Sequence, residues 1–516
     1  MTYDPFPAYP VVGGEVETGW PFPPRDAVVA IDGSPAVPWD ELPLDGLDLR
    51  ELYAPWDEVE RRTESFELPG DPVFGRLFAG ELRDFFARLP DRGPQVVYGP
   101  GAALAPHDVL WYVDVPKRRA LAERAPNLGQ RHGPGSEQRL LFVDWPVLDR
   151  HKQRLLPSLD RYVDFADPAR PLSLAGDSLR GSLRALAHRP FRVRPTFLPG
   201  PWGGRWLLDE LGVDEDAPNL AWSYELITPE SGVLLDGLEV GFELLLAAAG
   251  RELLGTEAYE RFGPSFPIRF DYLDTIGGGH LSIQCHPTDA YAREVFGLPY
   301  TQHESYYVMK TEPGATVFHG LRDDADVAAF RADAEAAARS GTPFEPARYL
   351  CAHPSQPHQL YLIPGGTPHA SGAGNVVLEI SATPYLYTLR FYDWLRRGLD
   401  GELRPVHLEH AFANLDGRGD SGPVGAPTVL RSGEGWRELV LGRHPDIFYA
   451  VHRLEFEREA EDDTRGRFHV LNLVEGDAID VAGHPLAYAE TLVVPASVGR
   501  YTLRGGPAKV VKAFVP

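Results

Sequence analysis

The stretch Leu362–Ala373, LIPGGTPHASGA, places one histidine, His369, directly after a turn built from prolines and glycines. Proline fixes the backbone angle φ, and glycine adopts angles that strain other residues. Such a turn therefore presents the next side chain in one reproducible direction. We expect it to aim His369 into the mouth of a β-barrel.

A second short string, LSIQCHP, lies upstream and supplies Gln284 and His286. These two residues are separated by one position, so on a β-strand their side chains leave the same face and converge on one ion, while Cys285 points away. Between the two strings, the Tyr-rich and strand-forming run YTQHESYYVM offers Glu304 as an anionic ligand. An amide oxygen, two imidazoles and a carboxylate suit Zn²⁺, with Mn²⁺, Fe²⁺ or Co²⁺ as alternatives.

Each of these residues also has a structural interpretation. A histidine beside a proline is usually a surface residue or a hydrogen-bonded core residue. We adopt that interpretation for four other histidines of this region: His303, His319, His353 and His358. A metal site is favoured by the joint occurrence, in this order, of Q-x-H, a glutamate flanked by strand-forming aromatics, and P-x-G-x-x-H.

Several strings together resemble the class I (cupin-type) mannose-6-phosphate isomerase family. They are LSIQCHP, the Glu304 segment, LIPGGTPHASG, NVVLEIS and LRFYDW. PTFLPGPWGGRWLLDELG and LAWSYELITPESGVLLDG are similar to strings nearer the family's amino terminus, and LAYAETLVVPASVGRYTL is similar to its second, metal-free barrel. The resemblance covers about residues 193 to 516.

The resemblance implies a metal-dependent aldose–ketose isomerase that interconverts mannose 6-phosphate and fructose 6-phosphate or a related sugar, with one Zn²⁺ per chain. Its metal ligands fall on Gln284, His286, Glu304 and His369. Ser282 matches a serine that helps hold the sugar phosphate, Glu379 is our preferred acid/base, and Arg390 is expected to steady negative charge on the intermediate or the phosphate. The structural alternatives are a rim carboxylate at Glu379 paired to Arg390, and a plain strand hydroxyl at Ser282.

One position departs from the family. A lysine commonly stands two residues before the ligand glutamate, whereas this chain has Gln302. The loss of a cation weakens the expectation of phosphate binding or proton transfer. Two rival functions therefore stay open: a non-catalytic or regulatory cupin that binds carbohydrate, and a metal-dependent dioxygenase on the same barrel.

Composition limits the partners of the protein. A chain of 516 residues with 43% hydrophobic content is long enough for two to four compact domains. The formal charge of −24 argues against a nucleic-acid partner, so we expect a small-molecule sugar or sugar phosphate instead. Two cysteines, Cys285 and Cys351, are too few for a disulfide framework. No secretory segment follows Met1 and no apolar stretch is long enough to span a membrane, which predicts a cytoplasmic protein without a membrane partner. The oligomeric state stays open.

The predicted fold is mainly β with an α/β amino-terminal part: two cupin (jelly-roll) β-barrels with a helical insertion, preceded by a small α/β module. We divide the chain into a Pro/Gly-rich lead-in over 1–65, the α/β module over 66–190, the metal-binding cupin domain over 193–420, and a second cupin-like barrel without metal over 421–516.

In the module, QVVYGPGAAL and DVLWYVDV are strand-like, and DPVFGRLFAGELRDFFARL from Asp71 has apolar residues near helical spacing. The module loosely resembles a nucleoside-kinase-like domain, but no G-x-x-x-x-G-K-[ST] is present to bind nucleotide phosphates, so we interpret it as degenerate or non-catalytic. FVDWPVLDRHKQRLL predicts a linker helix, with His151 and Lys152 as candidates to line an intermodule groove. In the insertion, Asp323 or Asp324 is expected to cap a helix that Gly341 ends and that can cover the site.

Overall fold

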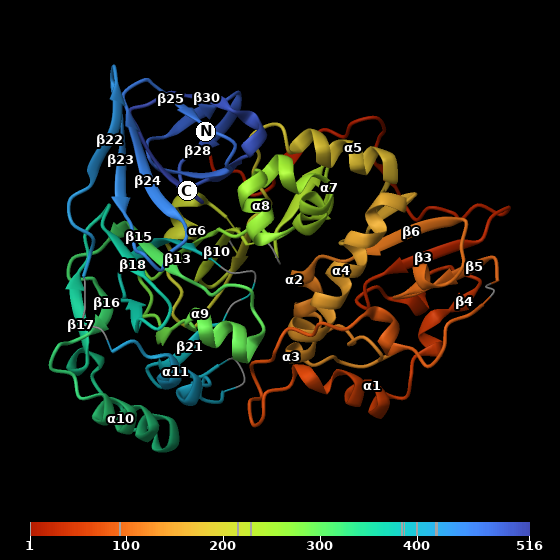
Figure 1. Ribbon diagram of the computed structural model, residues 1–516, viewed down its shortest axis with the longest axis horizontal. Coiled ribbons are helices and arrows are strands. Elements are labelled where there is room, and N and C mark those ends of the chain that lie inside the picture. The colour runs from red at the N-terminus through yellow and green to blue at the C-terminus, as the bar shows by residue number, and fades with distance from the viewer. Residues whose placement is uncertain are drawn as a thin grey trace.

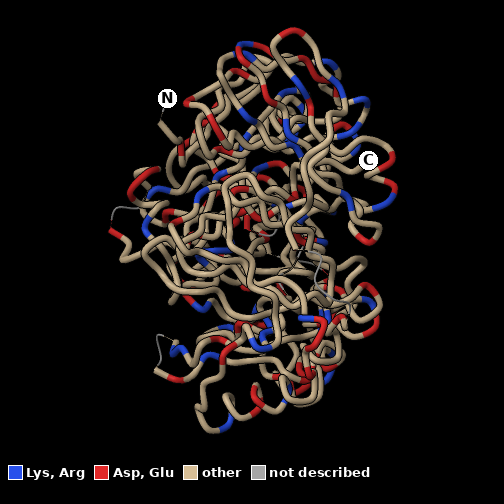
Figure 2. The backbone as a smooth tube through the Cα atoms, turned by 90° about the vertical axis from the view of Figure 1, so that its left-hand side faces the viewer, with Lys and Arg blue, Asp and Glu red and all other residues tan. Residues whose placement is uncertain are grey.

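The computed structural model describes residues 2–91, 94–213, 216–227, 230–382, 385, 387–398, 401–417 and 422–516. These residues form mostly β-sheets, with helices between and around them. The amino-terminal third lies on one side of the molecule, the middle of the chain on the other, and the carboxyl-terminal sheets above the middle (Figure 1). Acidic and basic positions are interspersed along the described chain (Figure 2).

The amino-terminal part is an α/β unit around a seven-stranded sheet of order β2-β8-β7-β6-β3-β5-β4. Its five strands from β4 to β7 run parallel, and β8 and β2 close one edge in antiparallel pairing. The strands are β2 (Glu17–Thr18), β3 (Val29–Gly33), β4 (Leu47–Asp48), β5 (Val96–Tyr98), β6 (Val109–Asp114), β7 (Arg161–Asp164) and β8 (Leu172–Ala175). Helices α1 (Trp56–Thr63), α2 (Lys117–Ala122), α4 (Trp145–Leu155) and α5 (Gly176–Leu186) surround it.

Two predictions for this part need correction. Residues 1–65 are not a lightly structured lead-in, because β3 is buried throughout and lies inside the sheet, as its apolar residues require. Residues 71–89 do not form a helix: they contain one 3-10 turn, Leu82–Phe85. Proline and glycine at positions 72, 75 and 80 disfavour a continuous helix, and the apolar side chains at helical spacing are still buried from an irregular loop.

The middle of the chain forms two antiparallel sheets, which we call the first sheet pair. One sheet contains β9 (Thr196–Leu198), β10 (Trp222–Leu226), β13 (Arg269–Asp274), β15 (Glu304–Thr311), β18 (Leu360–Ile363) and β20 (Asn375–Ser381). The other contains β14 (Ile283–Cys285), β16 (Thr316–Leu321), β17 (Leu350–Pro354), β19 (His369–Ser371) and β21 (Leu389–Tyr392). All predicted site residues lie on these strands or directly beside their ends.

The carboxyl-terminal part forms a second sheet pair, also antiparallel. Its larger sheet contains β22 (Thr428–Gly433), β23 (Trp436–Gly442), β24 (Ala450–Phe456), β26 (His469–Glu475), β29 (Thr491–Val494) and β31 (Ala508–Phe514). Its smaller sheet contains β25 (Glu459–Asp463), β27 (Ala478–Val481), β28 (His484–Ala487) and β30 (Arg500–Arg504). Within the described residues, the one cluster of metal-ligating side chains found is in the first pair.

The predicted insertion is helix α10 (Val327–Ser340). Asp326, rather than Asp323 or Asp324, caps it by accepting a hydrogen bond from the backbone N–H of Ala329, and Gly341 ends it in the left-handed conformation, as expected. Phe330 packs this helix against Phe412 of α11 (Leu408–Asn414) and Phe391 of β21.

The amino-terminal unit and the first sheet pair share one continuous hydrophobic core. Lys152 of α4 forms an ion pair with Glu243 of α7 (Phe242–Leu254), whereas His151 bonds Asp32 within the unit, so of the two predicted groove residues Lys152 reaches across. Among the described residues, no helix combines the length and apolar character needed to cross a bilayer.

Candidate metal centre

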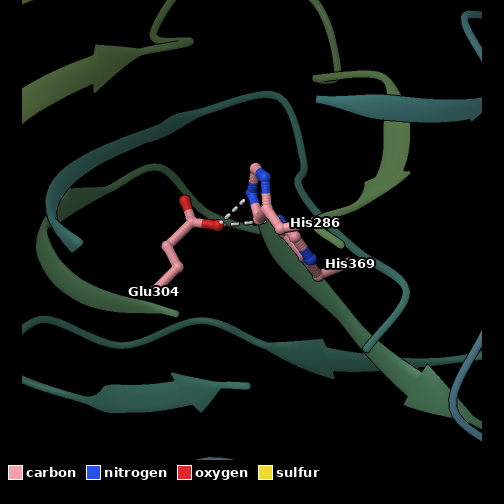
Figure 3. A group of neighbouring side chains, drawn as sticks. All are labelled: His286, Glu304 and His369. Atoms are coloured by element: carbon pink, nitrogen blue, oxygen red, sulfur yellow. Dashed lines mark hydrogen bonds and ion pairs between the residues drawn. The ribbon is translucent and has the colours of Figure 1, made fainter. Parts of the chain in front are cut away.

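Three predicted ligands converge in the first sheet pair. His286 directly follows β14, Glu304 begins β15 and His369 begins β19. Their ligand atoms all lie within 4.8 Å of one another, and all three residues are buried (Figure 3). Glu304 Oε2 is 2.7 Å from His286 Nε2 and 3.0 Å from His369 Nε2. The strand period and the Pro-Gly turn thus bring together residues that are distant in the sequence.

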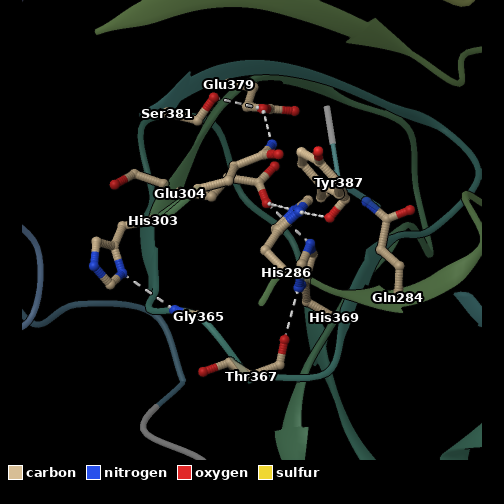
Figure 4. Close-up of polar contacts among 12 residues, drawn as sticks. Gln284, His286, His303, Glu304, Gly365, Thr367, His369, Glu379, Ser381 and Tyr387 are labelled. Carbon is tan, nitrogen blue, oxygen red and sulfur yellow. Dashed lines mark hydrogen bonds and ion pairs between the residues drawn. The ribbon is translucent and has the colours of Figure 1, made fainter. Parts of the chain in front are cut away.

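The hydrogen bonds on the far side of each imidazole decide its tautomer. His286 Nδ1 is 3.1 Å from the carbonyl oxygen of Tyr387, and His369 Nδ1 is 2.9 Å from that of Thr367 (Figure 4). Because a carbonyl oxygen only accepts, each Nδ1 carries a hydrogen, and in the neutral rings both Nε2 atoms direct lone pairs at a carboxylate. This is the second-sphere arrangement of metal-binding histidines.

Two buried atoms of the cluster, His369 Nε2 and Glu304 Oε1, have no hydrogen-bond partner. Unpartnered buried polar atoms are costly, and three facing acceptors repel one another unless a cation lies between them. Two imidazole nitrogens and a carboxylate are a donor set suited to a divalent ion such as Zn²⁺. The residues present therefore fit the predicted metal.

Neighbouring carboxyl groups add to the demand for positive charge. Glu379 of β20 and Asp271 of β13 face each other across paired strands, and Arg269 Nη2 is 2.7 Å from Glu379 Oε1. Burial, followed by the nearby carboxylates of Asp271 and Glu304, raises the pKa of Glu379 well above its usual value. Burial also raises the pKa of Asp271, to about 7. Three buried carboxyl groups thus share the single guanidinium of Arg269.

A cavity of about 730 Å³ opens beside this cluster, within the size range of small-molecule sites. Its lining includes Ser282, Gln284, His286, Glu379 and Arg390. None of its lining residues belongs to α10, so the predicted insertion helix does not cover the pocket.

Arg390 is a half-buried cation in this pocket. Its Nη1 donates to the carbonyl oxygen of Pro405 at 3.3 Å, while its Nε is buried without a hydrogen-bond partner. Burial, with a further contribution from the neighbouring charge of Arg404, lowers the pKa of Arg390 to about 10. An anion beside it would relieve both the missing hydrogen bond and the unfavourable charge.

Ser282 and Gln284 are both in the pocket, but they bond each other. The Ser282 hydroxyl donates to Gln284 Oε1 at 2.8 Å, and Gln284 lies on the strand beside His369 and Arg390. In Figure 4 the amide of Gln284 lies to one side of the His286, Glu304 and His369 cluster. The structure therefore brings three of the four predicted ligands into mutual contact.

The structural alternative for Glu379 named the wrong partner. Its guanidinium partner is Arg269, not Arg390. Arg269 and Asp271 were missed, although the alternation R-x-D within a fully buried strand places both on one face. Gln302, which stands where the family has lysine, is buried, and its Nε2 lies 3.4 Å from Glu379 Oε1.

The amino-terminal unit forms one wall of the cavity. Among its lining residues are Phe74, Leu141, Phe142 and Trp145, from the loop after α1 and the segment that leads into α4. The lining also includes Trp202, in the loop before β10, and Trp222, on β10. Aromatic walls with a few convergent polar groups are typical of small-molecule sites.

Known proteins resemble separate parts of the chain. A family described as a domain of unknown function (DUF8485) matches residues 17–188. Mannose-6-phosphate isomerase ManA of Bacillus subtilis is 22% identical over 326 residues, which are 61% of this chain and 96% of that protein. Mannose-6-phosphate isomerase of Streptococcus mutans is 25% identical over 311 residues, 59% of this chain and 92% of that protein.

A crystal structure of the mannose 6-phosphate isomerase from Bacillus subtilis aligns with a TM-score of 0.52 at 21% identity, covering 63% of this chain and 99% of that one. The homologues are thus mannose-6-phosphate isomerases that match somewhat over half of the chain, and the structural likeness supports the predicted type of fold for that part.

Proposed function

We propose that the protein is a metal-dependent aldose–ketose isomerase that interconverts mannose 6-phosphate and fructose 6-phosphate or a related sugar phosphate. The observation that carries the proposal is the joint presence, beside one cavity, of a three-ligand cluster and a half-buried guanidinium whose Nε is buried without a hydrogen-bond partner. The first provides for a divalent ion and the second for an anion. Isomerase relatives with similar sequences add support.

His286, Glu304 and His369 would hold Zn²⁺, and Gln284, which lines the cavity beside them, is the proposed fourth ligand. When bound, the ion supplies Lewis-acid stabilisation for negative charge that develops on a sugar oxygen. The two Nδ1–H groups keep both imidazoles in the ligating tautomer through their bonds to backbone carbonyls.

Glu379 is the proposed acid/base that moves a proton between C1 and C2 of the open-chain sugar. Its carboxyl group lies on the cavity wall, and Arg269 holds it through one charge-assisted hydrogen bond. A carboxyl with a raised pKa exchanges protons near neutral pH more readily than an exposed one. Gln302 offers it a neutral amide in place of the ammonium of the family's lysine.

Arg390 is proposed to bind the phosphate, with Ser282 beside it. The backbone of Arg390 is held on β21 by the strand pairing with Gln284 and by its N–H, which donates to His407 Nδ1 at 3.2 Å. Phosphate supplies the acceptor oxygens that the buried Nε lacks. A cytoplasmic location, expected from a sequence with two cysteines, is part of this proposal.

The test is a coupled assay of the zinc-loaded protein with mannose 6-phosphate, fructose 6-phosphate and unphosphorylated mannose. We expect conversion of the two phosphorylated sugars and little of mannose, because only the former engage Arg390. Arg390→Ala should raise KM for the phosphorylated sugars by about 10- to 100-fold, as expected for a lost charged hydrogen bond. If metal binds but none of the three is converted, the rival carbohydrate-binding function replaces this one.

A further inference from the structure

Tyr387, which lies in the middle of the chain, contacts both the metal cluster and the amino-terminal unit. The backbone carbonyl oxygen of Tyr387 accepts the hydrogen of His286 Nδ1 at 3.1 Å. Its side-chain hydroxyl donates to the carbonyl oxygen of Gly75 in the amino-terminal unit at 2.9 Å, and the residue is 1% exposed. A single buried residue therefore connects Gly75 to a metal-binding imidazole.

Aromatic packing holds the Tyr387 ring from both sides of the contact between the amino-terminal unit and the middle of the chain, which we call the seam. Phe74 and Phe142 of the amino-terminal unit lie with their ring centroids 5.5 and 5.6 Å from it, and Phe296 of the middle of the chain lies 4.2 Å away. Such pairs are favourable beyond the area they bury, and a ring enclosed on several sides has little freedom to rotate. The position of Tyr387 thus depends on the amino-terminal unit.

The loop that carries Gly75 is itself held firmly within its unit. Gln138 Nε2 donates to the carbonyl oxygen of Phe74 at 2.6 Å, and the Asp71 carboxylate accepts from the backbone N–H groups of Val73 and Phe74. The N–H of Leu77 donates to the carbonyl oxygen of Phe296 across the seam at 3.1 Å. Because this loop is held in place, its hydrogen bond from the Tyr387 hydroxyl restricts the position of Tyr387.

We propose that the amino-terminal unit is a permanent positioning element of the metal site: through Gly75 and Phe74 it holds Tyr387, whose carbonyl oxygen orients His286. The inference rests on the proposed metal site. It also gives a role to residues 17–188, whose matching family carries no function.

The test measures zinc affinity by competition with a chromophoric chelator, using the full-length chain. Tyr387→Phe removes only the hydroxyl that bonds Gly75, and Phe74→Leu loosens the ring cage from the amino-terminal side. Partners that orient metal ligands typically contribute 10- to 100-fold in affinity, so we expect both variants to bind zinc about 10-fold more weakly. The visible spectrum of the Co²⁺-substituted protein should change in both, reporting altered ligand geometry.

Two control variants isolate this effect. Tyr300→Phe removes a hydroxyl that bonds Ser265 and belongs to a ring that packs on Phe262 and Phe448, and Phe85→Leu weakens the core of the amino-terminal unit away from the cavity. Both should bind zinc like the unaltered protein. Should Phe74→Leu fail to fold, Tyr387→Phe, which deletes one oxygen atom, still decides.

Unchanged zinc affinity in Tyr387→Phe would overturn the inference while leaving the isomerase function in place. An equal loss in Phe85→Leu and Phe74→Leu would also overturn it, because the effect would then be general destabilisation. A protein that binds zinc with the predicted losses but isomerises no sugar would overturn the proposed function alone. An unaltered protein that binds no divalent ion would overturn both.

Discussion

The two sheet pairs each bury a cluster of carboxylates, but they balance its charge differently. In the second pair, Lys512 Nζ is 2.7 Å from Glu438 Oε1 and 2.6 Å from Asp462 Oδ2, and Arg431 forms ion pairs with both acids. Burial alone would raise the pKa of Glu438 and Asp462, but these cations and the hydrogen bond from His452 to Glu438 hold both pKa values below their usual range. The second cluster is satisfied by the protein itself.

In the first pair the carboxyl groups of Asp271, Glu304 and Glu379 outnumber their cation, and the pKa values of Asp271 and Glu379 are raised. Lys512 occupies, in the second pair, the electrostatic role that a divalent ion would fill in the first. Buried acids are therefore a poor guide to function by themselves. The shortage of a protein cation, together with unpartnered ligand atoms, distinguishes the site from the structural cluster.

Among variants that compare the two sheet pairs, we expect Glu304→Ala to have the largest effect on zinc content and turnover. Removal of the carboxylate that both imidazoles face should abolish stoichiometric zinc binding and lower turnover by at least about 10³-fold, because the metal and its charge stabilisation are lost together. Metal analysis of the purified variant and the coupled assay check this. Glu438→Gln, the matched change in the second pair, should keep one zinc per chain. A zinc-replete Glu304→Ala protein would contradict the assignment.

Glu379→Gln separates the metal site from the proton transfer. The amide preserves the size of the side chain and its contact with Arg269, but it neither accepts nor delivers the proton at neutral pH. We expect zinc content to stay at one per chain while kcat falls by about 10²- to 10⁴-fold, the usual contribution of a general acid/base. Near-normal turnover would assign the proton transfer to another residue.

Lys512→Met tests the second pair, where the cation belongs to the chain. The variant leaves Glu438 and Asp462 without their ammonium, and breaking a buried ion pair in this way costs about 3–5 kcal/mol. We expect an earlier urea-induced unfolding transition with unchanged zinc content. The triple variant Lys512→Met, Glu438→Gln, Asp462→Asn should recover part of the loss, since both buried carboxylates are then neutral and only the half-buried Arg431 loses its ion-pair partners. A stability loss confined to the first sheet pair would break the comparison.

Local patterns explain which parts of this picture were predictable from the sequence. Strand alternation and the Pro-Gly turn act over a few residues and indicated Gln284, His286 and His369, whereas Glu304 came from a strand-forming run and from the resemblance. Of these four, the structure brings His286, Glu304 and His369 together. The helix predicted over 71–89 was wrong because apolar spacing was weighted above Gly75 and Gly80, while tertiary burial decides such loops. Lead-in residues 29–33 form a central strand whose partners lie far along the chain.

Contacts between distant segments explain what was missed. Arg269 neutralises Glu379 from a strand 110 positions away, and Tyr387 bonds Gly75 across 312 positions. No periodicity records either contact, so the sequence predicted an Arg390 partner for Glu379 and left the role of the amino-terminal third open. The ligands followed from local geometry, whereas the residues that tune them required the assembled fold.

The smallest expected effect is on the pH dependence of stability in the metal-free protein. The pKa of Asp271 is about 7 in the folded state, above its unfolded value of about 4, so the folded state holds an additional proton between these values. Stability must then fall as pH rises from about 4 to 7, and Asp271→Asn should remove about 1–3 kcal/mol of that fall. Thermal unfolding of the metal-free proteins at pH 5 and pH 7.5 measures it.

Asp462, whose pKa is lowered, has the opposite effect on stability. It contributes stability above the unfolded pKa of about 4 that is lost on acidification, so Asp462→Asn should reduce the loss of stability at acidic pH. The same sign for both variants would mean that the two clusters do not differ in charge balance.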